Sequence, residues 1–256
     1  MEYLDLPDRT TGNRTYGLTS IIDLGTPIGE LTHILEDYHP FIDIAKIGIG
    51  SAYVTPFLQR KIDLYKQFNI KPYCGGTLFE KCYEQNKLPQ YLKSLYQLGI
   101  EWIEVSNGTI NIPLDERLVL ISQMKKEFHV IAEVGSKDSD HNLSLAEWVN
   151  EMQDLLAAGS EYVITEGRDS GTSGIYEKDG EIKSDLISEL VKEIDYKKII
   201  FEAPTTKQQM YFINLFGANV NLGNIKLSDI LTLETQRRGL RSETFYVENY
   251  ECKLPL

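Results

Sequence analysis

Short apolar runs rich in β-branched and aromatic residues recur along the chain, and stretches whose apolar positions have helical spacing lie between them. The runs lie at residues 20–25, 41–50, 70–76, 102–108, 129–136, 162–168, 198–204 and 219–225. Strands that alternate with helices favour a parallel sheet covered by those helices. The pattern therefore predicts eight strand–helix units.

The connecting segments include two amphipathic helices and one long loop. Over residues 115–128, Leu118 and Ile121 define an apolar stripe. Residues 145–159 show a similar pattern and end in Gly159, a residue suited to the end of a helix. The glycine-rich segment 166–184 follows the sixth run, and we expect it to form a hairpin or a mobile flap.

This alternation favours a closed barrel over an open, doubly wound sheet. The units follow one another at barrel-like spacing without a linker. No Gly-x-Gly-x-x-Gly motif opens the first helix, which argues against a dinucleotide-binding fold. We predict an α/β protein with a single (β/α)8 TIM barrel domain over residues 1–256, including an N-terminal extension at 1–18 and a C-terminal tail at 246–256.

Composition and charge narrow the functional classes. The formal net charge of −12 argues against nucleic-acid binding, because such binding requires a basic surface. There is no apolar run of membrane-spanning length, and the polar N-terminus lacks the apolar core of a signal peptide. We therefore expect a cytoplasmic protein without nucleic-acid or membrane partners. Any anionic ligand must be met by a local group of cations.

Cysteine and histidine residues predict neither a disulfide nor a soft-metal site. The three cysteines form no Cys-x-x-Cys pair, and we expect reduced thiols at Cys74, Cys82 and Cys252. The four histidines are scattered along the chain, and we assign none of them a catalytic role.

Polar residues lie where the predicted strands end, which is where barrel enzymes build their active sites. A polar side chain in such an apolar run is costly unless it is paired or faces a site. The residues at these ends are Asp23, Lys46, Gly75, Gly76, Thr77, Glu104, Ser106, Asn107, Glu133, Lys137, Glu166, Arg168, Glu202, Asn221 and Asn224. Nearly every predicted strand contributes to the candidate site.

The carboxylates of this set predict a metal ion. Several carboxylates that converge would repel one another, and Mg²⁺ is a hard cation that prefers oxygen ligands and would neutralise them. For any single carboxylate, an ion pair with Lys46 or Arg168 is an equally weighted alternative.

Lys46 and Arg168 are the candidate anion-binding cations. Gly48 and Gly50 follow Lys46, so a small anion could reach both the ammonium group and backbone N–H groups. Arg168 opens the glycine-rich segment, where a guanidinium can bind a phosphate or carboxylate with two hydrogen bonds. The alternatives are that Lys46 only balances neighbouring carboxylates and that Arg168 is a surface arginine.

Two glycine-containing turns are candidate phosphate sites. Gly75 and Gly76 precede a predicted helix, whose first N–H groups can bind an anion. Gly223 lies in the strand-eight segment that barrels often use for phosphate. Gly75 and Gly76 can equally serve a tight turn.

Three arginines lie near the end of the last predicted helix, at Arg237, Arg238 and Arg241. Their positive charges complement the helix dipole, and we favour this interpretation over direct ligand binding. Contacts between subunits are a further alternative.

Several motifs together resemble the phosphosulfolactate synthase family. They are "KIGIGS", "GGTLFEK", "IEVSNGT", "AEVGSKD", "ITEGRDSGTSGI", "IFEAPTTKQQ", "NVNLGNI" and "LETQRRGLRSETF", in this order. The resemblance runs from the first predicted strand to residue 245. It implies a homo-oligomeric (β/α)8 barrel lyase that adds sulfite to phosphoenolpyruvate, with Mg²⁺, to give (2R)-3-phosphosulfolactate. In that family the product leads to coenzyme M or to sulfolactate.

The resemblance also implies roles for individual residues. Lys137 matches the proposed proton donor, and Lys46 and Arg168 match further residues of the catalytic centre. The candidate metal ligands are Glu133, Glu166 and Glu202. The candidate substrate-binding residues are Gly75, Gly76, Thr77, Ser106, Asn107, Asn221, Gly223 and Asn224.

The motif of the second strand departs from the family pattern. The family commonly reads "KFGWGTS", whereas this chain reads "KIGIGSA", with Ile47 and Ile49 in place of the aromatic residues. This change alters the shape of the expected pocket. Two alternatives therefore stay open: a barrel lyase for another phosphorylated enol or 2-oxo acid, and a non-catalytic paralogue that binds an anion.

Overall fold

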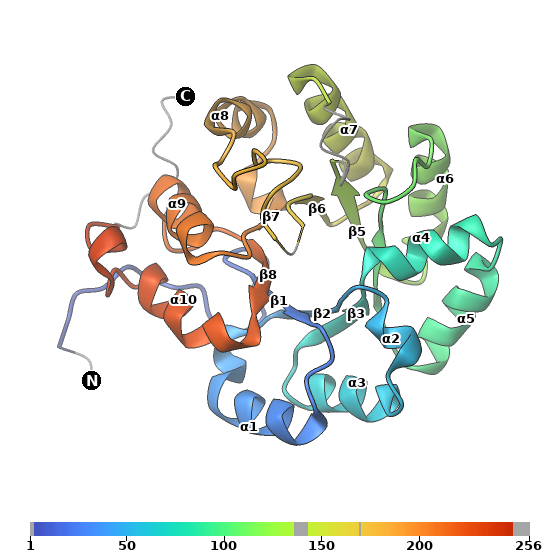
Figure 1. Ribbon diagram of the computed structural model, residues 1–256, viewed down its shortest axis with the longest axis horizontal. Helices are drawn as coiled ribbons and strands as arrows, with labels where there is room; N and C mark the ends of the chain where they lie inside the picture. Colours follow the sequence, from blue (N-terminus) through green and yellow to red (C-terminus); the bar gives the residue numbers. More distant parts are fainter. Residues whose placement is uncertain (1–2, 136–142, 169, 248–256) are drawn as a thin grey trace.

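Eight parallel strands form a barrel, as the sequence predicts (Figure 1). The computed structural model describes residues 3–135, 143–168 and 170–247. The strands are β1 (Thr19–Asp23), β2 (Ile44–Ile47), β3 (Lys71–Cys74), β4 (Trp102–Val105), β5 (His129–Val134), β6 (Tyr162–Thr165), β7 (Ile199–Glu202) and β8 (Leu222–Lys226). Their order is β3-β2-β1-β8-β7-β6-β5-β4, so the first strand pairs with the last. Within the described residues no ladder joins β3 to β4, and the barrel is nearly closed.

Helices surround the strands on the outside of the barrel (Figure 1). They are α1 (Ile28–Tyr38), α2 (Ser51–Val54), α3 (Leu58–Gln67), α4 (Gly76–Glu84), α5 (Leu88–Gln97), α6 (Leu114–Met124), α7 (Leu145–Ala158), α8 (Ser184–Glu193), α9 (Thr206–Phe216) and α10 (Ile230–Arg237). Two helices follow β2 and two follow β3, whereas the other connections described contain one α-helix each. None of the helices in the described ranges combines the length and apolar character needed to cross a lipid bilayer.

Local signals in the sequence account for the ends of α7. Ser144 accepts a hydrogen bond from Glu147 N, and the Glu147 side chain accepts one from Ser144 N, which satisfies two N–H groups at the start of the helix. Gly159, with φ of 124°, follows its last turn. The other predicted amphipathic helix is α6, whose buried face carries Arg117, Ile121 and Met124, with Leu118 only partly buried.

The segment after β6 forms a hairpin, which was one of the two predicted alternatives. Tyr176 and Ile182 form an antiparallel bridge, and Glu177 N donates to Glu181 O over 2.8 Å. Ile175 and Tyr176 are buried, so they anchor the hairpin against the barrel.

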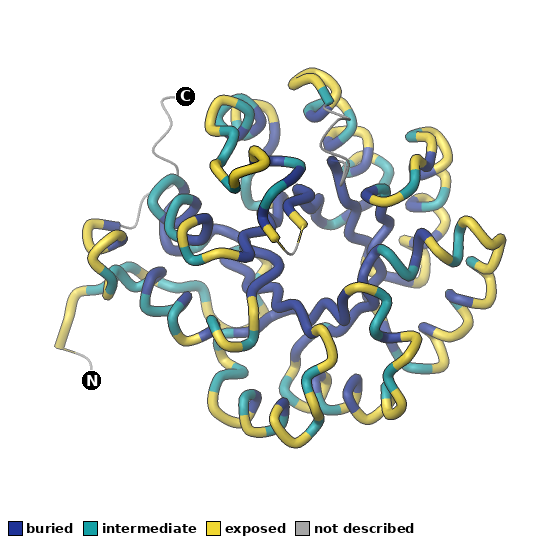
Figure 2. Tube along the Cα trace, in the orientation of Figure 1, coloured by how far each residue is buried: buried dark blue, intermediate teal, exposed yellow. Residues whose placement is uncertain are grey.

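Strand residues alternate between two apolar clusters. Ile21, Ala45 and Ile103 belong to the large cluster between the strands and the helices. A smaller cluster contains Leu18 and otherwise only strand residues, and we assign it to the barrel interior. Its members are Leu18, Ile44, Tyr73, Trp102, Ile131, Tyr162, Ile164 and Ile200. Figure 2 shows the strands as a buried ring, with exposed positions on the outer sides of the helices.

The alternation of strand side chains places charged groups inside the barrel. Lys46 lies two residues after Ile44, which is an interior residue, so both project to the same side. The same spacing relates Glu104 to Trp102, Glu133 to Ile131, Glu166 to Ile164, and Glu202 to Ile200. The apolar residues therefore fill the barrel, and the charged residues form the layer at the carboxyl ends of the strands.

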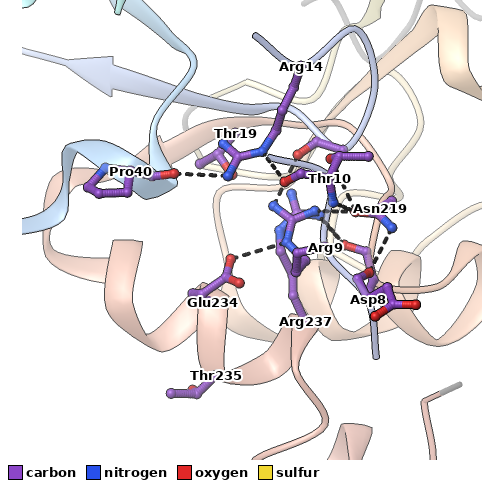
Figure 3. A network of polar contacts seen from close by, with 12 residues as sticks. Asp8, Arg9, Thr10, Arg14, Thr19, Pro40, Asn219, Glu234, Thr235 and Arg237 are labelled. Atoms are coloured by element: carbon purple, nitrogen blue, oxygen red, sulfur yellow. Dashed lines mark hydrogen bonds and ion pairs between the residues drawn. The ribbon is translucent and has the colours of Figure 1, made fainter. Parts of the chain in front are cut away.

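The opposite end of the barrel is crossed by the N-terminal segment (Figure 3). Arg9 donates to Glu234 and to the carbonyl oxygens of Gly17 and Ala218. Arg14 forms an ion pair of 3.0 Å with Asp43. These contacts tie the predicted N-terminal extension to the barrel.

Arg237 lies in the same network and is completely buried. It donates to the carbonyl oxygens of Ala218 and Val220 over 2.7 Å each, and to that of Leu18 over 3.1 Å. The sequence interpretation of Arg237 as a partner of the helix dipole missed this role, because its partners come from segments distant in sequence.

Candidate active site

A cavity of about 330 Å³ lies at the carboxyl ends of the strands. It is lined by Ile22, Lys46, Ile49, Gly76, Thr77, Glu104, Glu133, Glu166, Arg168, Ser170, Glu202 and Asn224. The predicted residues of β2, β4, β5, β6, β7 and β8 therefore meet around one space. Its charged lining consists of four carboxylates, one ammonium group and one guanidinium group.

Lys46 lies between two of the carboxylates. Its Nζ is 3.2 Å from Glu104 Oε2 and 3.1 Å from Glu202 Oε1. Burial by itself would lower the pKa of Lys46, but Glu104 and Glu202 outweigh it, and the pKa lies well above its ordinary value. Lys46 therefore stays protonated and supplies a fixed positive charge. It is not suited to act as a general base.

Glu202 accepts hydrogen bonds with both carboxylate oxygens. Lys46 Nζ contacts Oε1, and Gly167 N donates to Oε2 over 2.9 Å. The Tyr176 hydroxyl donates to the backbone carbonyl of Glu202 and so links the hairpin to this position. Burial raises the pKa of Glu202, Lys46 opposes that shift, and the nearby Glu133 adds to it, so the pKa lies above its ordinary value.

Glu133 is connected to a second buried carboxylate, Glu80, through Ser106. Ser106 Oγ is 3.0 Å from Glu133 Oε1 and 2.5 Å from Glu80 Oε1. The other Glu80 oxygen accepts from Thr109 N and Ile110 N over 2.7 and 2.8 Å. Glu80 therefore fixes both Ser106 and the loop after β4, next to the cavity.

Glu80 is a residue of the site region that the sequence does not predict. It lies on α4 and not at the end of a strand, so the rule used to find site residues does not reach it. The sequence gives no local sign that Glu80, on α4, meets Ser106, which lies just after β4.

Arg168 and Asn224 meet at the cavity in unusual backbone conformations. Their φ angles are 57° and 54°. Asn224 Nδ2 donates to Arg168 O over 3.3 Å, and Arg168 N donates to Glu166 Oε1 over 2.6 Å. Arg168 thus lines the cavity, as predicted, although the residue itself is exposed.

The glycines of the predicted turn have packing roles. A Cβ on Gly76 would lie 2.2 Å from Glu104 Oε1 and 2.4 Å from Ser106 Oγ, so only glycine fits there. Gly75 approaches Gly48 in the same way, with 3.2 Å between the position of a Cβ and Gly48 Cα. Gly76 and Thr77 also line the cavity, whereas Gly75 does not.

Three other predicted site residues that the structure describes lie outside the lining: Ser106, Gly223 and Asn107. Ser106 and Gly223 are next to it, in contact with Glu133 and near Glu202 respectively. Asn107 Oδ1 accepts from Ile112 N and shapes the loop after β4. Lys137, the predicted proton donor, lies outside the described residues, as does Cys252.

Asn221 is a correction to the sequence analysis. It precedes β8, at the end of the barrel opposite the cavity. Its Oδ1 accepts from Leu18 N over 3.0 Å, and its Nδ2 donates to Lys197 O and Ile199 O. Asn221 therefore joins strand ends and does not line the site. The prediction that Asn221 binds substrate is wrong, because this residue lies at the start of β8 and not at its carboxyl end.

Asp23 is a second predicted strand-end residue that does not line the cavity. It follows Ile22, which lines the cavity, so its own side chain projects to the helix side of the sheet. Its Oδ2 accepts from Lys61 Nζ over 2.8 Å and from the Tyr65 hydroxyl over 2.9 Å. Asp23 thus forms an ion pair, but with Lys61 and not with Lys46 or Arg168, the partners considered for the carboxylates.

The four carboxylates of the lining have the donor chemistry that Mg²⁺ prefers. Among the described residues, however, no three acidic, histidine or cysteine side chains are grouped as a ready metal site. Mg²⁺ is commonly held by one or two carboxylates together with substrate oxygens and water. The residues present are compatible with that mode of binding.

Comparison with known proteins identifies the family. The model of the (2R)-phospho-3-sulfolactate synthase (ComA) family matches residues 7–243. The chain belongs to this family. It is 38% identical to the phosphosulfolactate synthase of Bacillus subtilis, over 95% of this chain and 98% of that protein. It is 40% identical to the phosphosulfolactate synthase of Methanocaldococcus jannaschii, over 90% and 94% of the two chains.

Solved structures with little sequence identity share the barrel. The 3-hexulose-6-phosphate synthase of Salmonella typhimurium aligns with a TM-score of 0.53 at 13% identity, covering 86% of this chain and 99% of that chain. This likeness supports the TIM barrel fold alone. The resemblance and the fold predicted from the sequence are both confirmed.

Proposed function

We propose that this protein is a phosphosulfolactate synthase that adds sulfite to phosphoenolpyruvate in a Mg²⁺-dependent reaction. The product would be (2R)-3-phosphosulfolactate. Family membership supports the reaction. The observation that carries the proposal is the cavity in which Lys46 and Arg168 lie among four carboxylates at the carboxyl ends of the strands.

The cations of the cavity suit two anionic substrates. Phosphoenolpyruvate and sulfite repel each other, so a site that joins them must supply local positive charge. Lys46 is held protonated by Glu104 and Glu202, and Arg168 lies across the same space. These two groups would bind phosphate, carboxylate or sulfite oxygens. The lining itself carries four carboxylates and two cations, so Mg²⁺ would offset its excess negative charge when these anions bind to a protein of net charge −12.

Of the predicted ligands, Glu133 and Glu166 would hold Mg²⁺, because Glu202 already forms an ion pair with Lys46. When bound, the ion would act as a Lewis acid that draws electron density toward the substrate carboxylate. The sulfur of sulfite would bond to C3 of phosphoenolpyruvate, and C2 would take up a proton. We assign the delivery of that proton to Lys137.

The direct test mixes the purified protein with phosphoenolpyruvate, sulfite and Mg²⁺. We expect phosphosulfolactate, detected by phosphorus NMR and mass spectrometry. The absence of product with every divalent metal tried would overturn the proposal. Lys137→Ala should lose turnover with an unchanged melting temperature, and near wild-type activity of this variant would remove Lys137 from the mechanism.

The altered strand-two motif keeps a second candidate open. Ile49 lies at the cavity where the family commonly has an aromatic residue, so another phosphorylated enol or 2-oxo acid could be the substrate. A thermal-shift screen of such acids against phosphoenolpyruvate separates the two. Binding without turnover would instead support a non-catalytic paralogue. We also propose that the protein is a cytoplasmic homo-oligomer. Size-exclusion chromatography with light scattering tests the oligomeric state.

A further inference from the structure

Residues other than glycine with positive φ concentrate at the cavity. In the described ranges there are five, at Ile49, Asn69, Asn86, Arg168 and Asn224. Asn69 and Asn86 follow the ends of α3 and α4, where asparagine commonly adopts this conformation. The other three all line the candidate active site.

Ile49 is the most unusual of the three. Its φ is 51°, a region that a β-branched side chain disfavours because of steric conflict with the backbone. Its neighbours are Gly48 and Gly50, and a third glycine at position 49 would adopt this conformation without strain. Strained backbone of this kind is concentrated at functional sites, where the surrounding structure maintains it.

The surrounding structure does hold this turn in place. Gly48 N donates to Asp23 O, and Ser51 N donates to Gly48 O, each over 3.0 Å. A Cβ on Gly48 would lie 2.9 Å from the Ile22 side chain, so the backbone packs closely on β1. The conformation of Ile49 is therefore imposed on both sides.

Packing of the fold does not explain an isoleucine at this position. The side chain of Ile49 is largely exposed, with 60% of the residue accessible to solvent. It nevertheless lines the cavity, where, among the described residues, Ile22 and Ile49 are the only aliphatic side chains and the others are charged, polar or glycine. Ile49 thus presents an apolar surface to the interior of a charged site.

We infer that Ile49 is a specificity-determining residue. Its side chain, with that of Ile22, forms the apolar wall that contacts the carbon skeleton of a phosphorylated three-carbon acid and limits the size of the group carried by C3. The identity of this ligand rests on the proposed function. The wall leaves the phosphate and carboxylate groups to the cations on the other sides of the cavity.

The test compares phosphoenolpyruvate with its homologue that carries a methyl group on C3. Ile49→Ala removes part of the wall, and Val54→Ala is the matched control, because Val54 is an exposed aliphatic residue of α2 outside the cavity lining. We expect Ile49→Ala to raise the ratio of kcat/KM for the methyl homologue to that for phosphoenolpyruvate by about tenfold. Val54→Ala should leave this ratio at the wild-type value. An unchanged ratio in Ile49→Ala would overturn the inference.

A second pair of variants separates specificity from folding. Ile49→Gly relieves the backbone conformation and should leave the melting temperature unchanged or raised. Asn69→Gly, at a φ of 59° outside the cavity lining, is the control for the same backbone effect. A marked fall in the melting temperature of Ile49→Gly alone would show that Ile49 serves the fold, and would contradict the inference.

Binding measurements distinguish this inference from the proposed function. If the wild-type protein forms no phosphosulfolactate, the proposed function fails. The ratio of the Kd values of phosphoenolpyruvate and its methyl homologue, from calorimetry, then tests the wall. A shift in this ratio in Ile49→Ala and not in Val54→Ala supports the role of Ile49. An equal ratio in all three proteins, or no binding of either ligand to the wild type, overturns it.

Discussion

The two ends of the barrel both bury several charges, but in different ways. At the amino ends of the strands, guanidinium groups donate to neutral carbonyl oxygens and to two acids. Figure 3 shows two of these contacts, from Arg9 to Glu234 and from Arg14 to the carbonyl oxygen of Pro40. At the carboxyl ends, four carboxylates share a cavity with Lys46 and Arg168. Carbonyl oxygens satisfy a cation without adding a competing charge, whereas crowded carboxylates repel one another.

This difference separates a structural role from a chemical one. The network of Arg237 links β1, β8 and α10, and its donors point at fixed backbone atoms. In the cavity, Glu202 has a raised pKa because of its burial and of the nearby Glu133, with Lys46 opposing the shift. Both ends thus bury charged groups, and like charges crowded around a cavity distinguish the end that holds the candidate active site.

The largest expected effect is at the cavity. Lys46→Met removes the ammonium group between Glu104 and Glu202, and we expect turnover to fall by about 100-fold to 1,000-fold or more, because a positive charge aligned with anionic substrates is lost. Steady-state kinetics measures this effect. Lys192→Met, at an exposed lysine of α8, is the control and should keep wild-type activity. Equal activities of the two variants would contradict the role given to Lys46.

At the other end, Arg237→Leu should mainly change stability. Three buried carbonyl oxygens would lose a donor, at about 1 to 3 kcal/mol each, so the free energy of unfolding should fall by at least about 3 kcal/mol. Urea denaturation measures it. Arg238→Leu, at the partly buried neighbouring residue, should cost less than about 1 kcal/mol. The comparison between the two ends fails if Arg237→Leu lowers the activity per folded molecule as strongly as Lys46→Met does.

Glu80 connects structure and site, so it should show an intermediate effect. Glu80→Ala leaves Thr109 N and Ile110 N without an acceptor and should cost about 2 to 4 kcal/mol of unfolding free energy. Glu80→Gln keeps one acceptor oxygen and the volume of the side chain, and should lose less than half as much. Denaturant unfolding of the two variants measures this difference in unfolding free energy. If the two variants are equally stable, Glu80 does not hold the loop through its carboxylate.

The smallest expected effect is the pH dependence due to Asp23. Burial alone would raise its pKa, but Lys61 and the N–H groups of Gly25 and Thr26 outweigh burial and lower it from its ordinary value of 3.8. The stabilisation by ionised Asp23 is therefore complete above that ordinary value and is lost as the pH falls through the lowered native pKa. Asp23→Asn should cost about 1 to 3 kcal/mol at pH 7, and this cost should shrink below about pH 4.

Unfolding measurements from pH 7 to pH 2.5 test this prediction. A stability difference between the wild type and Asp23→Asn that stays constant over this range would show that the charge of Asp23 contributes nothing. The activity of the folded variant should be close to that of the wild type, because Asp23 faces α3 and not the cavity.

Polar residues at the ends of the predicted strands identified most of the cavity lining, because barrel topology brings those strand ends together. Lys46, Glu133, Glu166 and Glu202 were predicted from their positions after apolar runs, and they line one space. This criterion failed for Asp23, whose spacing from Ile22 directs it outward. It also failed for Asn221, which lies at the start of β8.

The sequence by itself determined the alternation of strands and helices, the family, and the charged layer at one end of the barrel. The physical reason is that these features depend on local periodicity and on residue type. Only the tertiary structure decided which charges are partners. Glu80 meets Ser106, and Arg237 meets Leu18, across long separations in sequence, because the barrel brings together elements that no local pattern relates.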